Sequence, residues 1–115
     1  MRALPPPPAL FAFDCDGTLA WGNPPGPVTP AMLDALKAMG YTVVIISDSG
    51  NCEGKGWPRD PYPQPLRHAG LRNNKERYGL GRCVYVSDNP GDDARAALAG
   101  CEYMRPEELA AHFGK

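Results

Sequence analysis

The chain contains three apolar runs, at residues 9–13, 41–46 and 83–86, each followed by polar residues. The second run is continuously apolar and mostly β-branched, which is typical of a strand buried on both faces of a parallel sheet. Helices are expected between these strands, and short links are expected to join each strand to the next helix. This order predicts an α/β fold with a parallel sheet and crossover helices.

The sequence also predicts where the helices begin and end. Residues 29–30, Thr-Pro, place a hydroxyl at the helix cap and a proline in the first turn, and Gly40 ends that helix. One face of it carries apolar residues at helical spacing, namely Met32, Leu33, Leu36 and Met39. Residues 89–90, Asn-Pro, are expected to begin the next helix in the same way. A short strand at 101–104 and a helix at 106–112 complete the predicted order.

Proline and glycine divide the chain into a leader and one domain. Residues 1–8 form a proline-rich leader, expected to be extended and loosely held, and residues 9–115 form a single domain of common size. Residues 20–30 are rich in proline and glycine and are expected to form an irregular loop over the site. The four prolines in residues 51–71 break any long helix or central strand. Either a sheet strand is lost there, or the segment forms a loop that partly covers a site.

Composition excludes some classes of protein. The net charge of −1 implies no general affinity for nucleic acid or membranes, and no stretch is long and apolar enough to span a bilayer. A cytoplasmic location is therefore the default expectation. The four cysteines are scattered, without a CxxC pair, so a zinc site is not favoured. Cys15 and Cys83 fall in predicted motif or strand positions, where reduced, buried thiols are expected.

Polar side chains follow each of the three predicted strands. Asp14 and Asp16 are two residues apart and therefore project to the same side of an extended segment. Ser47 follows the second strand and Asp88 the third. Ligands of parallel α/β sheets bind at the carboxyl ends of the strands. Two close carboxylates indicate a site for a hard metal ion and for covalent chemistry at a carboxylate, whereas the alternative is an ordinary Asp-rich turn.

This set of residues resembles the haloacid dehalogenase superfamily of phosphohydrolases. Residues 13–19, Phe-Asp-Cys-Asp-Gly-Thr-Leu, are similar to its first motif, and Ser47 corresponds to the second. Lys75 is the best candidate for the lysine of the third motif. Asp88 with Asp92 is similar to the fourth motif, GDxxxD, although serine stands where glycine is usual. The resemblance extends over roughly residues 9–105.

The resemblance implies a fold and an activity. The fold would be a three-layer sandwich with a Rossmann-like, mostly parallel sheet and helices on both faces, and without a large cap domain. The activity would be Mg²⁺-dependent hydrolysis of phosphomonoesters through an aspartyl-phosphate. Asp14 would attack phosphorus, and Asp16 would protonate the leaving oxygen and then accept a proton from water.

The resemblance also implies a metal site and a phosphate site. The metal residues would be Asp14, Asp16 and Asp88, with Asp16 contributing its carbonyl, while Asp92 would join the metal shell or orient its waters. Ser47 and Lys75 would bind the phosphoryl oxygens. Several alternatives stay open. Asp92 could simply be an acid favoured at a helix N-terminus, Lys75 could be an ordinary exposed lysine, and Lys55 is its rival.

The substrate is less well defined by the sequence. Residues 55–82 contain seven Lys or Arg and two acids, which would suit a polyanionic phosphate ester. Trp21, Trp57 and Tyr62 could stack on a base or sugar, or could pack their own loops. The partner could be a phosphorylated small molecule or a nucleic-acid end phosphate, and a homo-oligomer could cover the open site. Phosphotransfer and a noncatalytic metal-binding module of the same fold are the alternative functions.

Overall fold

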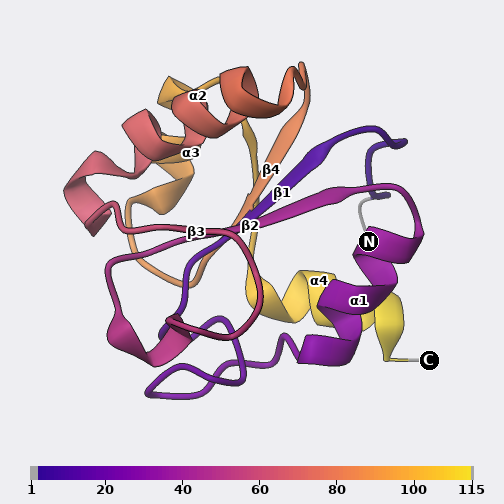
Figure 1. Cartoon of the computed structure of the whole chain (residues 1–115), viewed down its shortest axis with the longest axis vertical. Helices are drawn as coiled ribbons and strands as arrows, with labels where there is room; N and C mark the ends of the chain where they lie inside the picture. Colours follow the sequence, from indigo (N-terminus) through magenta and orange to yellow (C-terminus); the bar gives the residue numbers. More distant parts are fainter. Residues whose placement is uncertain (1–2, 115) are drawn as a thin grey trace.

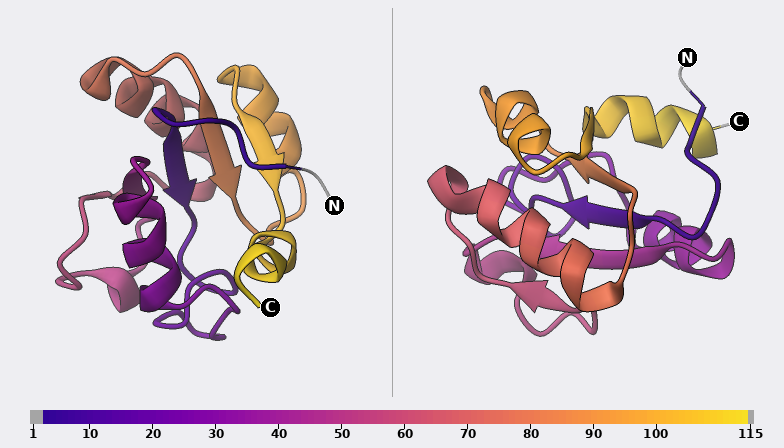
Figure 2. Two further views of the ribbon diagram at one scale, coloured as in Figure 1. Left: turned by 90° about the vertical axis from the view of Figure 1, so that its right-hand side faces the viewer. Right: turned by 90° about the horizontal axis from the view of Figure 1, so that it is seen from above.

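The computed structural model describes residues 3–114, and its centre is a five-stranded sheet. The strands are β1 (Leu10–Phe13), β2 (Thr42–Ile46), β3 (Arg59–Asp60), β4 (Cys83–Val86) and β5 (Glu102–Met104). They lie in the order β3-β2-β1-β4-β5, and every neighbouring pair is parallel. The adjacent arrows of β1 and β4 point the same way in the left view of Figure 2. The predicted α/β class and parallel sheet are therefore confirmed.

Within residues 3–114, four α-helices accompany the sheet. They are α1 (Pro30–Ala38), α2 (Arg67–Tyr78), α3 (Asp92–Leu98) and α4 (Pro106–Phe113), and the 3₁₀ turns η1 (Gly50–Cys52) and η2 (Gln64–Leu66) lie between β2 and α2. In Figure 1, α1 and α4 lie on one side of the strands, and α2 and α3 lie on the other. No helix within residues 3–114 is long and apolar enough to cross a membrane.

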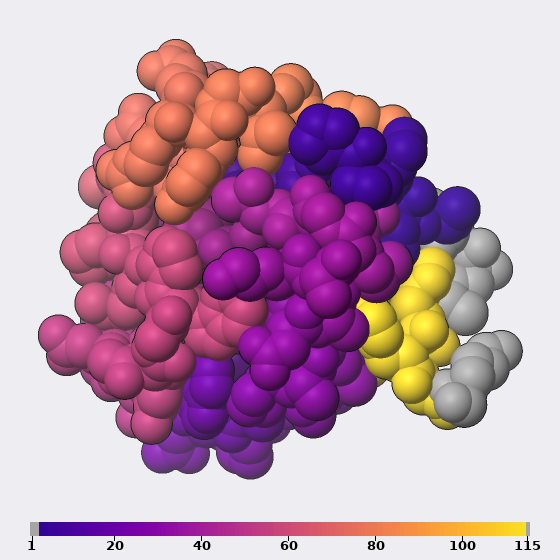
Figure 3. Space-filling model, turned by 45° about the vertical axis from the view of Figure 1, so that its right-hand side comes forward, coloured from indigo at the N-terminus to yellow at the C-terminus, as the bar shows by residue number. Residues whose placement is uncertain are grey.

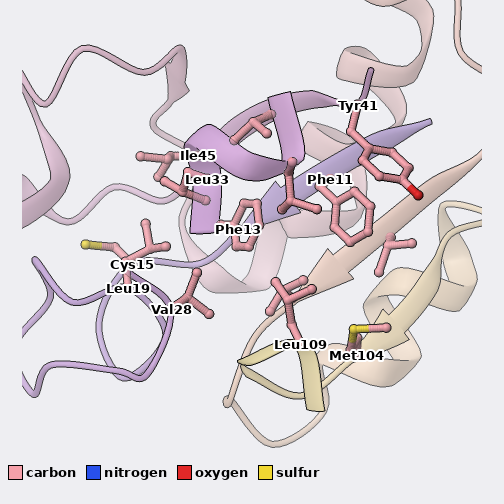
Figure 4. Packing of buried hydrophobic residues seen from close by; sticks show 14 of the residues in the cluster. Phe11, Phe13, Cys15, Leu19, Val28, Leu33, Tyr41, Ile45, Met104 and Leu109 are labelled. Carbon is pink, nitrogen blue, oxygen red and sulfur yellow. The ribbon is translucent and has the colours of Figure 1, made fainter. Parts of the chain in front are cut away.

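Side chains of β1 alternate between two hydrophobic clusters, as the two-residue period of a strand requires. Phe11 and Phe13 belong to the first cluster, together with Leu33 of α1 and Leu109 of α4 (Figure 4). The second cluster contains the alternate residues of β1 with residues of α2 and α3, including Leu10, Ala12, Leu71 and Ala96. Because β1 is completely buried between these clusters, the residues that follow it are held at a fixed position.

One predicted helix start is confirmed and another is wrong. The Thr29 hydroxyl accepts a hydrogen bond from the Met32 amide at 3.3 Å, and α1 begins at Pro30 as predicted. By contrast, α3 begins at Asp92 rather than at residues 89–90. Asn89 lies in a turn, with its carbonyl accepting from the Asp92 amide at 3.2 Å. This turn leaves the Asn89 side chain available to contact other residues.

Residues 51–71 combine features of both alternatives that the sequence left open. A strand is retained, but β3 has only two residues, Arg59 and Asp60, paired with the end of β2. The prolines that follow cannot donate backbone hydrogen bonds, so this edge strand is not extended. Residues 63–65 instead line a cavity next to the sheet.

The leader is held more firmly than predicted. Pro5 is buried, and its carbonyl accepts a hydrogen bond from the Tyr41 hydroxyl at 2.5 Å. Leu4 packs against the first hydrophobic cluster. Figure 3 shows the indigo leader lying over the purple segment near residue 40 and beside the orange segment near residue 80. The expectation of a loosely held leader is therefore wrong for residues 4–5, while Met1 and Arg2 lie outside the described residues.

Candidate functional site

A cavity of about 580 Å³ lies at the carboxyl ends of β1 and β2. Its lining comes from four segments: the ends of β1 and β2, the turn after β4, and the start of α2 with the turn before it. The lining residues are Asp14, Asp16, Ser47, Asp48, Ser49, Pro63, Gln64, Pro65, Arg67 and Asn89. The structure thus brings together Asp14, Asp16 and Ser47 of the predicted site.

Asp14 is almost completely buried, with 3% of its surface exposed, and both of its carboxylate oxygens have partners. Oδ1 forms an ion pair with Arg67 Nη1 at 2.7 Å. Oδ2 accepts hydrogen bonds from Asn89 Nδ2 at 3.1 Å and from the Thr18 hydroxyl at 3.4 Å. Burial raises the pKa of Asp14 above its ordinary value, and the hydrogen bond and charge of Arg67 offset this only in part.

Arg67 is the functional residue that the sequence interpretation missed. It is the first residue of α2 and is buried, and its Nε donates to the Tyr62 carbonyl at 2.8 Å. Its Nη1 also donates to the buried Tyr85 hydroxyl at 2.7 Å. Burial opposes the charged form, but Tyr85 and Asp14 raise the pKa of Arg67 overall. The signal in the sequence was slight, namely a cation two residues after Pro65, the last proline of the proline-rich segment.

Asp16 lies in a more open environment than Asp14. Its Oδ1 accepts three hydrogen bonds, from the Asn23 amide at 2.9 Å, Asn51 Nδ2 at 2.9 Å and the Ser49 hydroxyl at 3.2 Å. Burial alone would raise the pKa of Asp16, but these donors bring it below its ordinary value. Within the described residues, Oδ2 accepts no hydrogen bond and is therefore the oxygen available to the cavity.

A disulfide lies beneath the two carboxylates. Cys15 is bonded to Cys52 of η1, with the two Cα atoms 6.1 Å apart. The expectation of a reduced thiol at Cys15 is therefore wrong, whereas Cys83 and Cys101 are free and buried. The sequence did not reveal this pairing, because the 37-residue separation says nothing about the proximity of η1 to the loop after β1.

Ser47 is at the position predicted for it. It is buried at the end of β2 and lines the cavity, and its hydroxyl oxygen accepts a hydrogen bond from the Ser49 amide at 3.1 Å. The hydroxyl proton of Ser47 is thus left to donate to a ligand. This is the contact that a phosphoryl oxygen would require.

Asp88 packs against the loop that contains Asp16. A Cβ atom placed on Gly17 would lie 2.1 Å from Asp88 Oδ2, and Gly17 has a φ of 77°, so only glycine fits there. Asp88 Oδ1 is buried without a hydrogen-bond partner among the described residues. Burial raises the pKa of this carboxyl. An unpartnered buried carboxylate oxygen is an available ligand for a cation.

Asp92 is fully buried and already has several partners. It accepts hydrogen bonds from the Ser87 hydroxyl at 2.6 Å and from Asn89 Nδ2 at 3.4 Å, and it pairs with Arg95 at 3.0 Å. It does not line the cavity. Since Asn89 also reaches Asp14, Asp92 acts on the site by orienting Asn89.

The structure does not place Lys75 with the other predicted site residues. Its Nζ donates to the carbonyls of Ala99 and Gly100 at 3.2 and 3.3 Å, at the end of α3, and it lines a separate cavity of about 280 Å³. It lies on the part of α2 remote from the cavity because Arg67, two turns earlier, occupies the position nearest Asp14. Lys55, its rival, is exposed and lies 6.0 Å from the ring centre of Trp21.

The basic segment predicted beside the site is mostly directed elsewhere. Of the seven Lys and Arg residues at 55–82, Arg67 is the one that lines the cavity. Arg77 pairs with Asp60, and Arg82 pairs with Glu102. The aromatic residues also have structural roles, because Trp21 and Trp57 pack against the first hydrophobic cluster and Tyr62 against the second.

Mg²⁺ fits part of the predicted ligand set. Within residues 3–114, no group of three or more His, Cys, Asp or Glu side chains is arranged to hold a metal ion. The Asp14 and Asp88 carboxylates and the Asp16 carbonyl are nevertheless hard oxygen donors of the kind that Mg²⁺ prefers. The unpartnered Asp88 oxygen fits this role, although Asp88 does not line the cavity, whereas Asp92 is fully engaged. Both oxygens of Asp14 are engaged as well, so Asp14 would have to exchange a partner to bind the ion.

Comparisons of the chain with protein-family models, curated proteins and solved structures find no match. The assignment of a function therefore depends on the geometry of the cavity.

Proposed function

We propose that the protein is a phosphomonoester hydrolase with Asp14 as its nucleophile. The observation that carries this proposal is the convergence of Asp14, Asp16, Ser47 and Arg67 on one cavity at the carboxyl ends of two parallel strands. The same proposal assigns the chain to the haloacid dehalogenase superfamily, with a three-layer, Rossmann-like sandwich and no large cap. Helices that contribute residues to both hydrophobic clusters support the three-layer arrangement.

The reaction would proceed in two displacements. A carboxylate oxygen of Asp14 bonds to phosphorus while the ester oxygen departs and takes a proton from Asp16. Water then attacks the phosphorus of the aspartyl-phosphate and gives a proton to Asp16, which releases inorganic phosphate and restores Asp14. Because Asp16 Oδ1 is held by three donors, Oδ2 is the oxygen that would carry the proton.

Arg67 takes the phosphate-binding role that the sequence assigned to Lys75. To contact a phosphoryl group it would share its guanidinium between Asp14 and the incoming oxygens, while the Ser47 hydroxyl donates a further hydrogen bond. The cavity lining contains three carboxylates and one guanidinium, so a phosphate dianion needs more positive charge there. Mg²⁺ held by Asp14, Asp88 and the Asp16 carbonyl would supply that charge.

The test is turnover of p-nitrophenyl phosphate with Mg²⁺, with EDTA and in the Asp14→Asn variant. We expect Asp14→Asn to reduce turnover by at least about 10³-fold, because the nucleophile is lost. Asp93→Asn, which changes an exposed acid on α3, is the matched control and should leave turnover intact. Full activity in Asp14→Asn would contradict the proposal.

A second candidate is a noncatalytic module of the same fold. The ion pair that already occupies Asp14 Oδ1 favours it, since a free nucleophile would be expected in an active site. No turnover of a panel of phosphorylated small molecules and 3′- or 5′-phosphorylated oligonucleotides, together with no Mg²⁺ binding, would select this candidate. Product analysis with added acceptor alcohols would distinguish phosphotransfer from hydrolysis.

The proposal also covers the location of the protein in the cell and its oligomeric state. A cytoplasmic protein and a homo-oligomer that covers the open cavity remain predictions. The Cys15–Cys52 disulfide is more usual in oxidising compartments and therefore weighs against the cytoplasmic prediction.

A further inference from the structure

The position of Asp16 depends on a short segment that is distant in the sequence. Two of the three donors to its Oδ1, the Ser49 hydroxyl and Asn51 Nδ2, come from the turn that follows β2. The same Ser49 hydroxyl caps η1 by accepting a hydrogen bond from the Asn51 amide at 3.3 Å. Ser49 and Asn51 together are called the clamp below. In Figure 1 this magenta turn and the purple loop after β1 lie at the same end of the molecule.

The disulfide joins the two sides of this arrangement. Cys15 directly precedes Asp16, and Cys52 directly follows Asn51. Both cysteines are at least 99% buried, so the covalent bond lies inside the protein. The clamp contacts Asp16 nearer the surface. Asp16 is thus one residue from Cys15, and Ser49 and Asn51 are three residues and one residue from Cys52.

Few other contacts hold η1 in place. Arg59 Nη2 donates to the Ser49 carbonyl and the Ser49 amide donates to the Ser47 hydroxyl, both at 3.1 Å, and Cys52 packs in the first hydrophobic cluster. Residues 53–56 are exposed. Gly54 and Gly56 have no atoms near the position of a Cβ, so the chain after the disulfide runs through open space. A three-residue 3₁₀ turn has little stability of its own. The disulfide is therefore the strongest restraint on the clamp.

We propose that Ser49 and Asn51 are positioning residues for Asp16, and that the Cys15–Cys52 disulfide keeps them in place, so that the site is assembled only in the oxidised chain. The consequence for turnover rests on the proposed function, but the structural part does not. Asp16 loses its fixed position when the bond is broken, while Asp14 keeps its partners from α2 and from the turn after β4.

Reduction of the Cys15–Cys52 bond is a thiol–disulfide exchange with a dithiol reductant. One thiolate of the reductant attacks a cysteine sulfur and breaks the S–S bond, giving a mixed disulfide. The second thiol of the reductant then displaces the remaining cysteine. The protein ends with two thiols, and the reductant ends as a cyclic disulfide. Because both sulfurs are buried, this exchange requires η1 to open first.

The first experiment measures structure without any substrate. Denatured under non-reducing conditions, the oxidised chain should show two free thiols, Cys83 and Cys101. After reduction, or in the Cys15→Ala/Cys52→Ala variant, amide exchange at Asn23 and Asn51 should rise by about tenfold or more, as for a locally opened segment. The Asn23 amide is a direct probe, because it donates to Asp16 Oδ1. Cys101→Ala is the control and should leave both amides unchanged.

The second experiment tests positioning through kinetics. Asn51→Asp keeps the shape of the side chain but replaces the amide donor with a carboxylate that repels Asp16, and should lower kcat by about tenfold with little change in KM. Asn51→Gln keeps the donor and should restore part of the loss. The disulfide-free variant should show the same loss in kcat as Asn51→Asp. A merely structural role would give no rescue by glutamine.

The outcomes separate this inference from the proposed function. Four free thiols in the oxidised preparation, or unchanged exchange at Asn23 after the bond is broken, would overturn the inference even if the protein is a phosphatase. A lack of turnover in every variant would overturn the proposed function and the kinetic consequence. Increased exchange at Asn23 would then still support the disulfide as the restraint on Asp16.

Discussion

Asp14 and Asp16 are two residues apart, yet their surroundings differ in almost every respect. Asp14 is buried and contacts Arg67, Asn89 and Thr18, while Asp16 is partly exposed and held by the clamp and the Asn23 amide. Burial raises the pKa of Asp14, and hydrogen bonds lower that of Asp16. Sequence spacing can thus place two carboxylates on one cavity while their surroundings shift the two pKa values in opposite directions.

This order of pKa values has a consequence for the proposed reaction. The nucleophile must be ionised and the acid must be protonated, which is the reverse of what the two environments favour. Arg67 is therefore needed to keep Asp14 charged. Asp16 must gain its proton at Oδ2 after substrate binds, since Oδ1 is already occupied. Changes on each side of the cavity should thus have distinct effects.

Removal of Arg67 should have the largest effect and should act mainly on Asp14, although the charge of Arg67 also helps to lower the pKa of Asp16. Arg67→Met leaves a buried carboxylate without its cation, which costs about 3–5 kcal/mol of unfolding free energy at neutral pH. Urea denaturation measures this loss. Arg82→Met, which breaks the exposed pair with Glu102, is the control and should change stability by less than about 1 kcal/mol.

The pH dependence of the unfolding free energy of Arg67→Met tests whether Arg67 stabilises the protein through its charge. A carboxyl whose pKa is raised in the folded state contributes stability that is lost as pH rises through that pKa. Without Arg67, the pKa of Asp14 should rise further, so the deficit should be greatest at neutral pH and shrink below the ordinary aspartate pKa. An equal deficit at acid and neutral pH would show that Arg67 acts through packing rather than through its charge.

Loss of the disulfide should have the next largest effect and should act on the Asp16 side. A cross-link that closes a loop of this length, with a sequence separation of 37, stabilises a protein by about 4 kcal/mol. Thermal unfolding of the Cys15→Ala/Cys52→Ala variant should show this loss, while the Asp14–Arg67 pair stays intact. Carbon-13 shifts of the Asp14 carboxyl that change as much as those of Asp16 would contradict the separation of the two sides.

A side chain at Gly17 should disturb the loop between the two carboxylates and Asp88. Gly17→Ala places a Cβ 2.1 Å from Asp88 Oδ2 in a backbone conformation that alanine rarely adopts, which costs about 2 kcal/mol. We also expect weaker Mg²⁺ binding, measured by calorimetry. Gly81→Ala is the matched control, since nothing lies near its Cβ position and its φ is not positive. Equal stability of the two variants would show that Asp88 moves freely.

The parallel sheet and the position of Asp14, Asp16 and Ser47 were predictable because they depend on local patterns. An apolar run followed by a polar turn indicates a buried strand of a parallel sheet. It also indicates that the polar residues lie at the carboxyl end of that sheet, where ligands bind. Capping at Thr29 is likewise encoded within three residues. These features need no knowledge of which distant segments meet.

Arg67, Asn89 and the disulfide were not predictable, because each depends on contacts between segments far apart in the chain. Arg67 is one of seven similar cations, and only the packing of α2 selects it over Lys75. Asn89 was interpreted as the start of a helix, since asparagine before proline favours that role, and its side chain instead reaches Asp14. The prolines of residues 58–65 gave no indication of which residue would follow them into the cavity.

The Tyr85 hydroxyl should have the smallest effect, and it tests whether Arg67 itself is positioned. Tyr85→Phe removes the acceptor of an Arg67 Nη1 hydrogen bond, which costs about 1 kcal/mol of stability. Tyr41→Phe removes a hydroxyl bonded to the Pro5 carbonyl, far from the cavity, and should cost about the same. If Tyr85 holds Arg67 toward Asp14, only Tyr85→Phe should also lower phosphatase turnover. Equal turnover in the two variants would mean that the ion pair with Asp14 and the Tyr62 carbonyl orient Arg67 without help, so that the Asp14 side is fixed by charge alone.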